Sequence, residues 1–226
     1  MMIEANDIKP TPWDAAVFGM PTWELANDSE LTLKKYAQLA GHQTLRVDPL
    51  SNKGLLQAHG FYYCDTLMEP RCTAALLRPE LHVAATINKN ARANDLLEIC
   101  HGAFAHDRFH RDFNLSGVEA DLRYNNWLNQ LVAAGQVYGL YWHGQLAGFI
   151  AHQEKALILH AVAQQYRSQG LAKFWWSAVC NALLASGFTE VSSSISASNT
   201  AVVNLYASLG FSFFAPKDVY HRFVIG

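Results

Sequence analysis

The sequence is short of charge, and neither sign dominates. Only 16% of its 226 residues are Asp, Glu, Lys or Arg, and the formal net charge is −2. Because there is no surplus of basic residues, no protein-wide field attracts nucleic acid or an anionic membrane surface. An anionic ligand must therefore be held by a local site.

Cysteine is also scarce. The four cysteines, Cys64, Cys72, Cys100 and Cys180, form no CxxC pair, and no histidine lies near them at metal-ligand spacing. This pattern predicts neither a metal centre nor a disulfide framework. It favours a reducing, cytoplasmic compartment.

Long apolar runs are missing as well. No apolar stretch approaches the roughly 20 residues that cross a bilayer, and residues 1–13 lack the apolar core of a signal peptide. We therefore expect neither membrane insertion nor secretion. Half of the residues are apolar, which is ample for a buried core in one large domain or two small ones.

What the sequence does contain is an apolar, strand-like run that leads into a polar turn, residues 157–172. The turn includes Arg167 and Gly170, and the helical run KFWWSAVCNALLAS follows it. A helix N-terminus presents unpaired N–H groups and partial positive charge, which suit a diphosphate. The turn has no P-loop Lys-Ser/Thr pair and lacks the first glycine of GxGxxG.

Hydrophobic periodicity and turn residues predict an alternating α/β chain. The expected helices cover residues 31–40, 53–59, 93–104, 118–133, 173–186 and 200–209. The expected strands cover residues 44–47, 61–68, 81–87, 136–142, 146–153, 156–163, 190–197, 211–214 and 220–225. Residues 1–28 are expected to be loop with short extended pieces. The breaker-rich stretch 69–80 suggests a smaller N-terminal α/β lobe, 1–80, and a main domain, 81–226.

One local pattern occurs twice. Ser51-Asn52 opens a predicted helix that ends at Gly60-Phe61, and Ser198-Asn199 opens one that ends at Gly210-Phe211. The second helix is three residues longer. A degenerate internal repeat and a chance similarity both remain open.

Three features together resemble the GNAT N-acetyltransferases. The turn reads Arg167-x-x-Gly170-x-Ala172, like the pyrophosphate loop of that family, and the order β-α-α-β-β-β-α-β-α-β runs from residue 81. Residues 199–211 are similar to the family's N-x-x-A-x-x-L-Y-x-x-x-G-F segment, with Val202 where the family usually has Ala. The resemblance implies an α/β fold with a mixed, mostly antiparallel sheet flanked by helices. Acetyl-CoA would lie where two strands splay apart.

The resemblance also implies roles for individual residues. Tyr206 is the implied general acid, because a phenol stays protonated at neutral pH and can protonate a leaving thiolate. The implied cofactor contacts are His160, Ala161, Val162, Arg167, Ser168, Gln169, Gly170, Leu171, Ala172, Asn199 and Tyr206.

The base is less clearly indicated, because the strands at 156–163 and 191–197 carry no carboxylate. Motifs earlier in the chain resemble the TDP-fucosamine acetyltransferase group. They are Trp13, Phe18-Gly19, Gly60-Phe61, Phe104-x-x-x-Arg108-Phe109-x-x-Asp112 and Tyr124-x-x-Trp127. In that group an acidic residue after the Gly-Phe pair is the proposed base, and Asp65 matches it. His160 and an ordered water chain are the alternatives.

This narrower resemblance implies a dTDP-linked amino sugar as acceptor. Such a ligand needs cations for its diphosphate and a stacking surface for its base, which Arg108, Phe109 and Arg111 would supply. The competing interpretation is a solvated loop that covers the core. A metal site at His106 and His110 is disfavoured, because no cysteine lies nearby and i, i+4 histidines occur by chance.

Two other functions remain open from the sequence. One is a GNAT acetyltransferase for another amine, such as a protein N-terminus, a polyamine or a small metabolite. The other is a catalytically silent acyl-CoA-binding module. The sequence leaves the oligomeric state undecided, a homodimer among the options.

Overall fold

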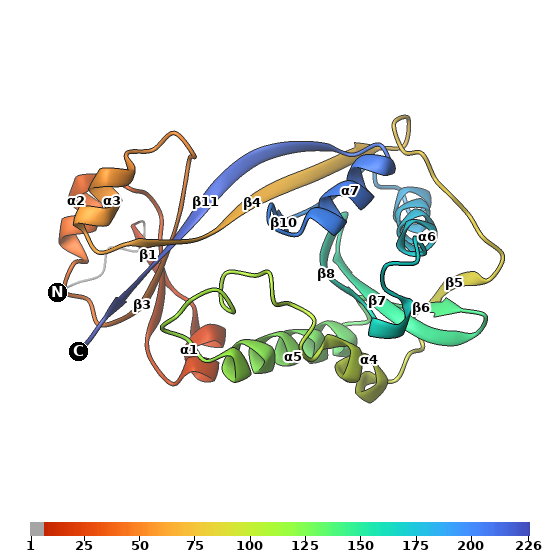
Figure 1. The fold of residues 1–226 in the computed structure, drawn as a ribbon, viewed down its shortest axis with the longest axis horizontal. Helices are drawn as coiled ribbons and strands as arrows, with labels where there is room; N and C mark the ends of the chain where they lie inside the picture. The colour runs from red at the N-terminus through yellow and green to blue at the C-terminus, as the bar shows by residue number, and fades with distance from the viewer. Residues whose placement is uncertain (1–6) are drawn as a thin grey trace. The chain divides into compact units, whose positions relative to one another are not determined.

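The computed structural model describes residues 7–226 (Figure 1). Residues 1–6, where the expected N-terminal loop and lobe begin, lie outside the described residues. The chain divides into two compact units. The first unit holds the residues up to Leu67 together with Ala105–Arg123 and Pro216–Gly226, and the second holds Met68–Phe104 and Tyr124–Ala215.

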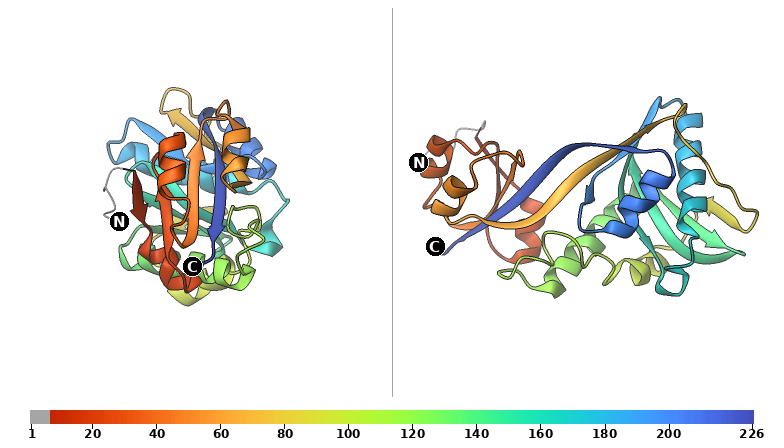
Figure 2. Two further views of the ribbon diagram at one scale, coloured as in Figure 1. Left: turned by 90° about the vertical axis from the view of Figure 1, so that its left-hand side faces the viewer. Right: turned by 45° about the horizontal axis from the view of Figure 1, so that its top comes forward.

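The first unit contains a sheet in the order β1-β2-β3-β11-β4. Its elements are β1 (Ile8–Pro10), α1 (Pro12–Phe18), β2 (Thr22–Leu25), α2 (Glu30–Lys35), β3 (Gly41–Val47), α3 (Lys53–Ala58), the start of β4 (Tyr62–Thr73), the start of α5 (Gly117–Ala133) and the end of β11 (Ser212–Val224). β3 pairs in parallel with β2 and antiparallel with β11, as Figure 2 shows. Buried side chains from α2, α3 and the strands form its core, including Leu33, Leu45 and Leu56.

The helix α1 was not expected in the predicted loop 1–28. Pro12 sits at its first position, where the missing N–H costs nothing, and Gly19 ends it with φ +63°. The buried carboxylate of Asp14 accepts a hydrogen bond from Arg123 Nε at 2.6 Å. Pro12 therefore starts a helix within the stretch that was expected to be loop. α2 is also shorter than the predicted 31–40.

The second unit contains strands in the order β4-β9-β8-β7-β6-β5. Its elements are the end of β4, β5 (Ala85–Asn88), α4 (Ala93–Cys100), most of α5, β6 (Val137–Trp142), β7 (Gln145–Gln153), β8 (Ala156–Val162), the 3-10 turn η1 (Gln164–Tyr166), α6 (Ala172–Ala185), β9 (Glu190–Ser193), β10 (Ile195–Ser196), α7 (Thr200–Ser208) and the start of β11. β5 to β8 form the antiparallel meander that is seen in Figure 1, and β8 runs parallel to β9. The predicted turn at His143-Gly144 is confirmed, with φ +46° and +79°.

Helices cover both faces of this second sheet. On one face α6 and α7 bury Trp175, Trp176, Cys180 and Tyr206 against the strands. On the other face α4 and α5 pack Leu96 and their other apolar residues against β7 and β8. Within residues 7–226, no helix is long and apolar enough to cross a membrane.

Several predicted boundaries were wrong. The strand expected at 81–87 is β5, which begins only at Ala85, and the one expected at 190–197 is divided between β9 and β10. The two strands expected at the C-terminus are one strand, β11, which continues through Ala215 with φ +46° and through Pro216. Pairing with β4 and, from Asp218 onward, with β3 keeps the segment extended.

Candidate functional site

The parallel strands β8 and β9 separate soon after they meet. They pair only at Ala156 with Ser192 and at Leu157 with Ser193. Beyond these pairs β10 joins β4 instead of β8, so the edge of β8 from Ile158 onward has no strand partner on this side. An unpaired strand edge offers backbone donors and acceptors to an extended ligand.

Alternation along β8 determines which backbone groups face that open edge. Ala163 N donates to Ala147 O at 2.8 Å, on the side where β8 pairs with β7. Since the backbone N–H and C=O groups alternate in direction along an antiparallel strand, the N–H and C=O of Ala161 also face β7. The N–H and C=O groups of His160 and Val162 face the open edge. Of the three predicted backbone contacts, His160 and Val162 are therefore the exposed ones along this edge.

The predicted pyrophosphate loop follows β8 and leads into α6. Ser168 and Gly170 both have left-handed backbone conformations, with φ +59° and +71°. Such alternating conformations turn successive N–H groups toward one concave surface that suits anions. A Cβ atom added to Gly170 would meet nothing within 4 Å, so the space beside the loop is open. Arg167 Nε donates to Val162 O at 2.7 Å, which ties the loop to the end of β8.

Tyr206 lies in α7, and its hydroxyl is directed at β8. The side chain is fully buried, and Oη is 3.4 Å from His160 Nε2. Burial raises the pKa of the phenol, although the nearby side chains of Ser193 and Trp176 act in the opposite direction. Burial also lowers the pKa of His160 to about 4, so its imidazole is neutral at pH 7. The pair thus combines a protonated phenol with an uncharged ring.

Asn199 is the N-cap of α7. Its side-chain oxygen accepts the N–H of Val202 at 3.3 Å, which satisfies one of the unpaired donors at the start of the helix. The helix start is thereby fixed, and with it the direction in which Tyr206 leaves the helix.

Asp65 and Arg111, which were singled out separately, come together in the first unit. Asp65 is 1% exposed, and its Oδ1 accepts hydrogen bonds from Arg111 Nη1 at 3.0 Å and from Thr66 N at 2.8 Å. The expected base is therefore one partner of an ion pair. Tyr206 belongs to the second unit.

Phe109 is part of the core of the first unit. It is 3% exposed and packs against Phe18, with ring centroids 5.6 Å apart. The guanidinium groups of Arg108 and Arg123 lie 4.6 and 4.4 Å from its ring centre. These contacts fit the competing interpretation, in which this segment covers the core. They fit less well with a Phe109 ring that is free to stack on a nucleotide base.

The sequence analysis missed a buried polar cluster in the first unit. Asp112 Oδ2 lies 2.8 Å from His42 Nε2 and 2.7 Å from His221 Nδ1, and all three side chains are almost fully buried. Burial alone would raise the pKa of Asp112, but hydrogen bonds from both histidines and from Asn114 N lower it. The three residues are 70 and 109 positions apart, so no local spacing signals this cluster.

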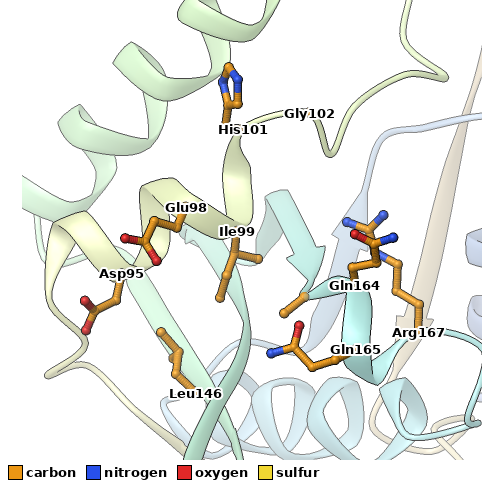
Figure 3. Close-up of a pocket in the computed structure, with 10 residues that line it drawn as sticks. Asp95, Glu98, Ile99, His101, Gly102, Leu146, Gln164, Gln165 and Arg167 are labelled. Atoms are coloured by element: carbon orange, nitrogen blue, oxygen red, sulfur yellow. The ribbon is translucent and has the colours of Figure 1, made fainter.

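A cavity of about 470 Å³ adjoins the loop in the second unit (Figure 3). Gln164, Gln165 and Arg167 line one side of it, and Asp95 and Glu98 of α4 line the other. Asp95 is partly neutralised by Arg92 at 2.9 Å. The cavity was not predicted, because α4 and the loop are about 60 residues apart and meet only through the fold.

These features define an α/β protein whose sheet opens between two parallel strands beside the start of a helix. A family model described as acetyltransferase (GNAT) domain matches residues 113–222. Residues 113–222 are thus similar to a GNAT acetyltransferase domain. The match includes β8, the loop, α6 and α7, which form the splayed site.

Solved structures agree with this fold. A GCN5-related N-acetyltransferase from Sphaerobacter thermophilus is 15% identical, with a TM-score of 0.62 over 89% of this chain and 72% of that chain. A functionally unknown conserved protein from Staphylococcus epidermidis is 15% identical, with a TM-score of 0.65 over 99% and 94%. A GCN5-related N-acetyltransferase from Kribbella flavida is 14% identical, with a TM-score of 0.59 over 98% and 89%.

At these identities the likeness concerns the fold alone, and the fold of this chain is the GNAT fold. No curated protein sequence matches the chain.

Proposed function

We propose that the protein is an acetyl-CoA-dependent N-acetyltransferase that acts on the primary amine of a nucleotide-linked amino sugar. The observation that carries the proposal is the separation of β8 from β9, with the Tyr206 hydroxyl beside the open part of β8. The open edge suits the pantetheine arm, and the loop from Arg167 to Ala172 suits the pyrophosphate. Asn199 would contact the cofactor arm.

In the proposed reaction the amine nitrogen attacks the thioester carbonyl carbon. A backbone N–H at the open edge of β8 polarises the carbonyl oxygen. As the C–S bond breaks, Tyr206 gives its proton to the sulfur, and the raised pKa of the phenol keeps that proton available at neutral pH. The proton lost by the nitrogen balances the one that sulfur gains.

We assign the base to Asp65 as a working hypothesis, with His160 and ordered water as alternatives. Arg111 Nη1 lies 3.0 Å from Asp65 Oδ1, which places a cation directly beside the proposed base. Arg108 and Arg111 are the proposed cations for a diphosphate. The four cysteines are all buried and form no disulfide among the described residues, which is consistent with our inference of a cytoplasmic protein.

One observation favours a second candidate, an acetyltransferase for a cationic amine such as a polyamine. The cavity beside the loop carries the carboxylates of Asp95 and Glu98, as Figure 3 shows. Carboxylates attract an ammonium group and repel a diphosphate. A pocket of this charge therefore suits a polyamine better than a nucleotide sugar.

Acceptor screening with the full chain tests the proposal. Acetyl-CoA binding is measured first by calorimetry, and CoA release is then followed with dTDP-linked amino sugars, polyamines and peptides with a free N-terminus. We expect turnover with the amino sugars. Turnover with polyamines or peptides alone would remove the nucleotide sugar, and binding without any turnover would indicate a silent acyl-CoA-binding module.

A further inference from the structure

Trp176 has a buried hydrogen-bond donor that the protein itself does not use. The residue lies in the second turn of α6 and is 2% exposed. Its indole Nε1 makes no hydrogen bond to any of residues 7–226. A buried donor without a partner is destabilising, so such groups are uncommon in native proteins and call for an explanation such as a ligand that accepts the hydrogen bond.

The neighbouring tryptophan shows that this is not a general property of the helix. Trp175 is equally buried, but its Nε1 donates to Tyr141 O at 2.8 Å. The two indoles thus differ in one respect: the N–H of Trp175 has an acceptor, and that of Trp176 does not.

The surroundings of Trp176 are those of the splayed strands. Its ring packs edge-on against His160 with centroids 5.0 Å apart, and His160 Nε2 lies 3.4 Å from Tyr206 Oη. The Trp176 indole lies close enough to the Tyr206 phenol to lower the pKa of the phenol, although Nε1 makes no hydrogen bond within the usual geometric limits. The free N–H and the phenol are therefore neighbours beside the open part of β8.

We propose that the Trp176 indole N–H binds the sulfur atom of acyl-CoA and stabilises it as the C–S bond breaks. This inference rests on the proposed function and adds a second donor to it. Tyr206 transfers its proton to the sulfur, whereas Trp176 contributes a hydrogen bond and keeps its own proton. The electron pair of the C–S bond passes to the sulfur.

The physical reason is that sulfur gains negative charge only as the bond breaks. A hydrogen bond to a charged acceptor is stronger than one to a neutral thioester sulfur. Because Trp176 and Tyr206 are buried and His160 is only partly exposed, a sulfur that enters between them is shielded from water, which strengthens the bond. A donor of this kind favours the transition state over the ground state.

The test uses Trp176→Phe, which removes the N–H and keeps an aromatic ring, and Trp175→Phe as the matched control. Calorimetry compares CoA with desulfo-CoA, and thiolate absorbance gives the pKa of the bound CoA thiol. Trp176→Phe should raise that thiol pKa and lower CoA affinity by roughly tenfold or more at a pH where the thiol is ionised, with desulfo-CoA binding unchanged. Trp175→Phe should change neither.

A measurement on the unaltered protein covers the case in which Trp176→Phe does not fold. In protein with 15N-labelled tryptophan, the Trp176 indole N–H resonance should shift downfield with CoA and stay in place with desulfo-CoA. Equal shifts with both ligands, or an unchanged thiol pKa in folded Trp176→Phe, would overturn the inference. If the unaltered protein binds neither CoA nor desulfo-CoA, the proposed function is wrong as well. If it binds both, the comparison tests only the role of Trp176.

Discussion

Leu56 and Tyr206 hold the same place in two helices that end alike. Leu56 O accepts the N–H of Phe61 at 3.0 Å, and Tyr206 O accepts the N–H of Phe211 at 3.1 Å. The glycine before each phenylalanine has a left-handed conformation, with φ +78° at Gly60 and +91° at Gly210. The two segments share a local geometry, but only the second has a hydroxyl group at this place.

Asparagines open both helices in the same way. The side-chain oxygen of Asn52 accepts Leu55 N at 3.1 Å, and that of Asn199 accepts Val202 N at 3.3 Å. The strands before them also match, because β2 with β3 and β8 with β9 are parallel pairs joined by one helix. The degenerate repeat stays a prediction, and chance similarity remains the alternative; in either case the first segment has Leu56 where the second has Tyr206.

Tyr206→Phe should lower the turnover number by roughly a hundredfold or more while acetyl-CoA affinity changes little, because a general acid contributes 10²–10⁴ in rate. Leu56→Met is the control, since it alters the matching buried position without touching a hydroxyl. Stopped-flow detection of released CoA measures both. Full activity in Tyr206→Phe would show that another group protonates the sulfur.

Gly170→Val should weaken acetyl-CoA binding by at least tenfold, because a β-branched residue is strained at φ +71° and would occupy the open space beside the loop. Gly187→Val is a matched control, with φ +106° and equally open surroundings just beyond the other end of α6. Calorimetry gives both affinities. Equal losses in the two variants would point to general destabilisation, and tight binding by Gly170→Val would contradict the loop assignment.

Asp65→Asn should lower the turnover number by at least tenfold with acetyl-CoA affinity unchanged, if its carboxylate accepts the proton of the amine. Arg111→Gln removes the same 3.0 Å ion pair and leaves the carboxylate in place. Comparing the two variants therefore distinguishes a catalytic role of the Asp65 carboxylate from a purely structural role in the ion pair. Equal turnover losses in both variants would mean that the ion pair matters and that the base is His160 or water.

The buried His221 makes the free energy of unfolding depend on pH. Burial lowers the pKa of His221 to about 4, from about 6.5 for a histidine in water, against the effect of its hydrogen bond to Asp112. The unfolded chain therefore binds this proton more readily, so the stabilisation is present above pH 6.5 and is lost as the pH falls toward 4.

Urea unfolding of the full chain between pH 7 and pH 4 measures this effect. The free energy of unfolding should fall by up to about 1.4 kcal/mol per pH unit through His221, and His221→Gln should reduce that slope. A slope that is identical in His221→Gln would show that other groups cause the acid sensitivity.

The sequence by itself determined the local features of this protein. Helical periodicity, Asn199 as a cap, and the turn with Gly170 all act within a few residues, so the second unit's order of elements could be read from the chain. The position of the predicted anion-binding loop followed from the same signals, and the proposed role of Tyr206 followed from the resemblance.

Only the tertiary structure decided what depends on distant pairing. Whether 211–225 forms one strand or two was set by its pairing with β3, and the cluster of His42, Asp112 and His221 required three remote segments to meet. The unused N–H of Trp176 is invisible in the sequence, because Trp175 beside it is chemically identical. Whether a buried donor finds an acceptor depends on which strand the fold places opposite it.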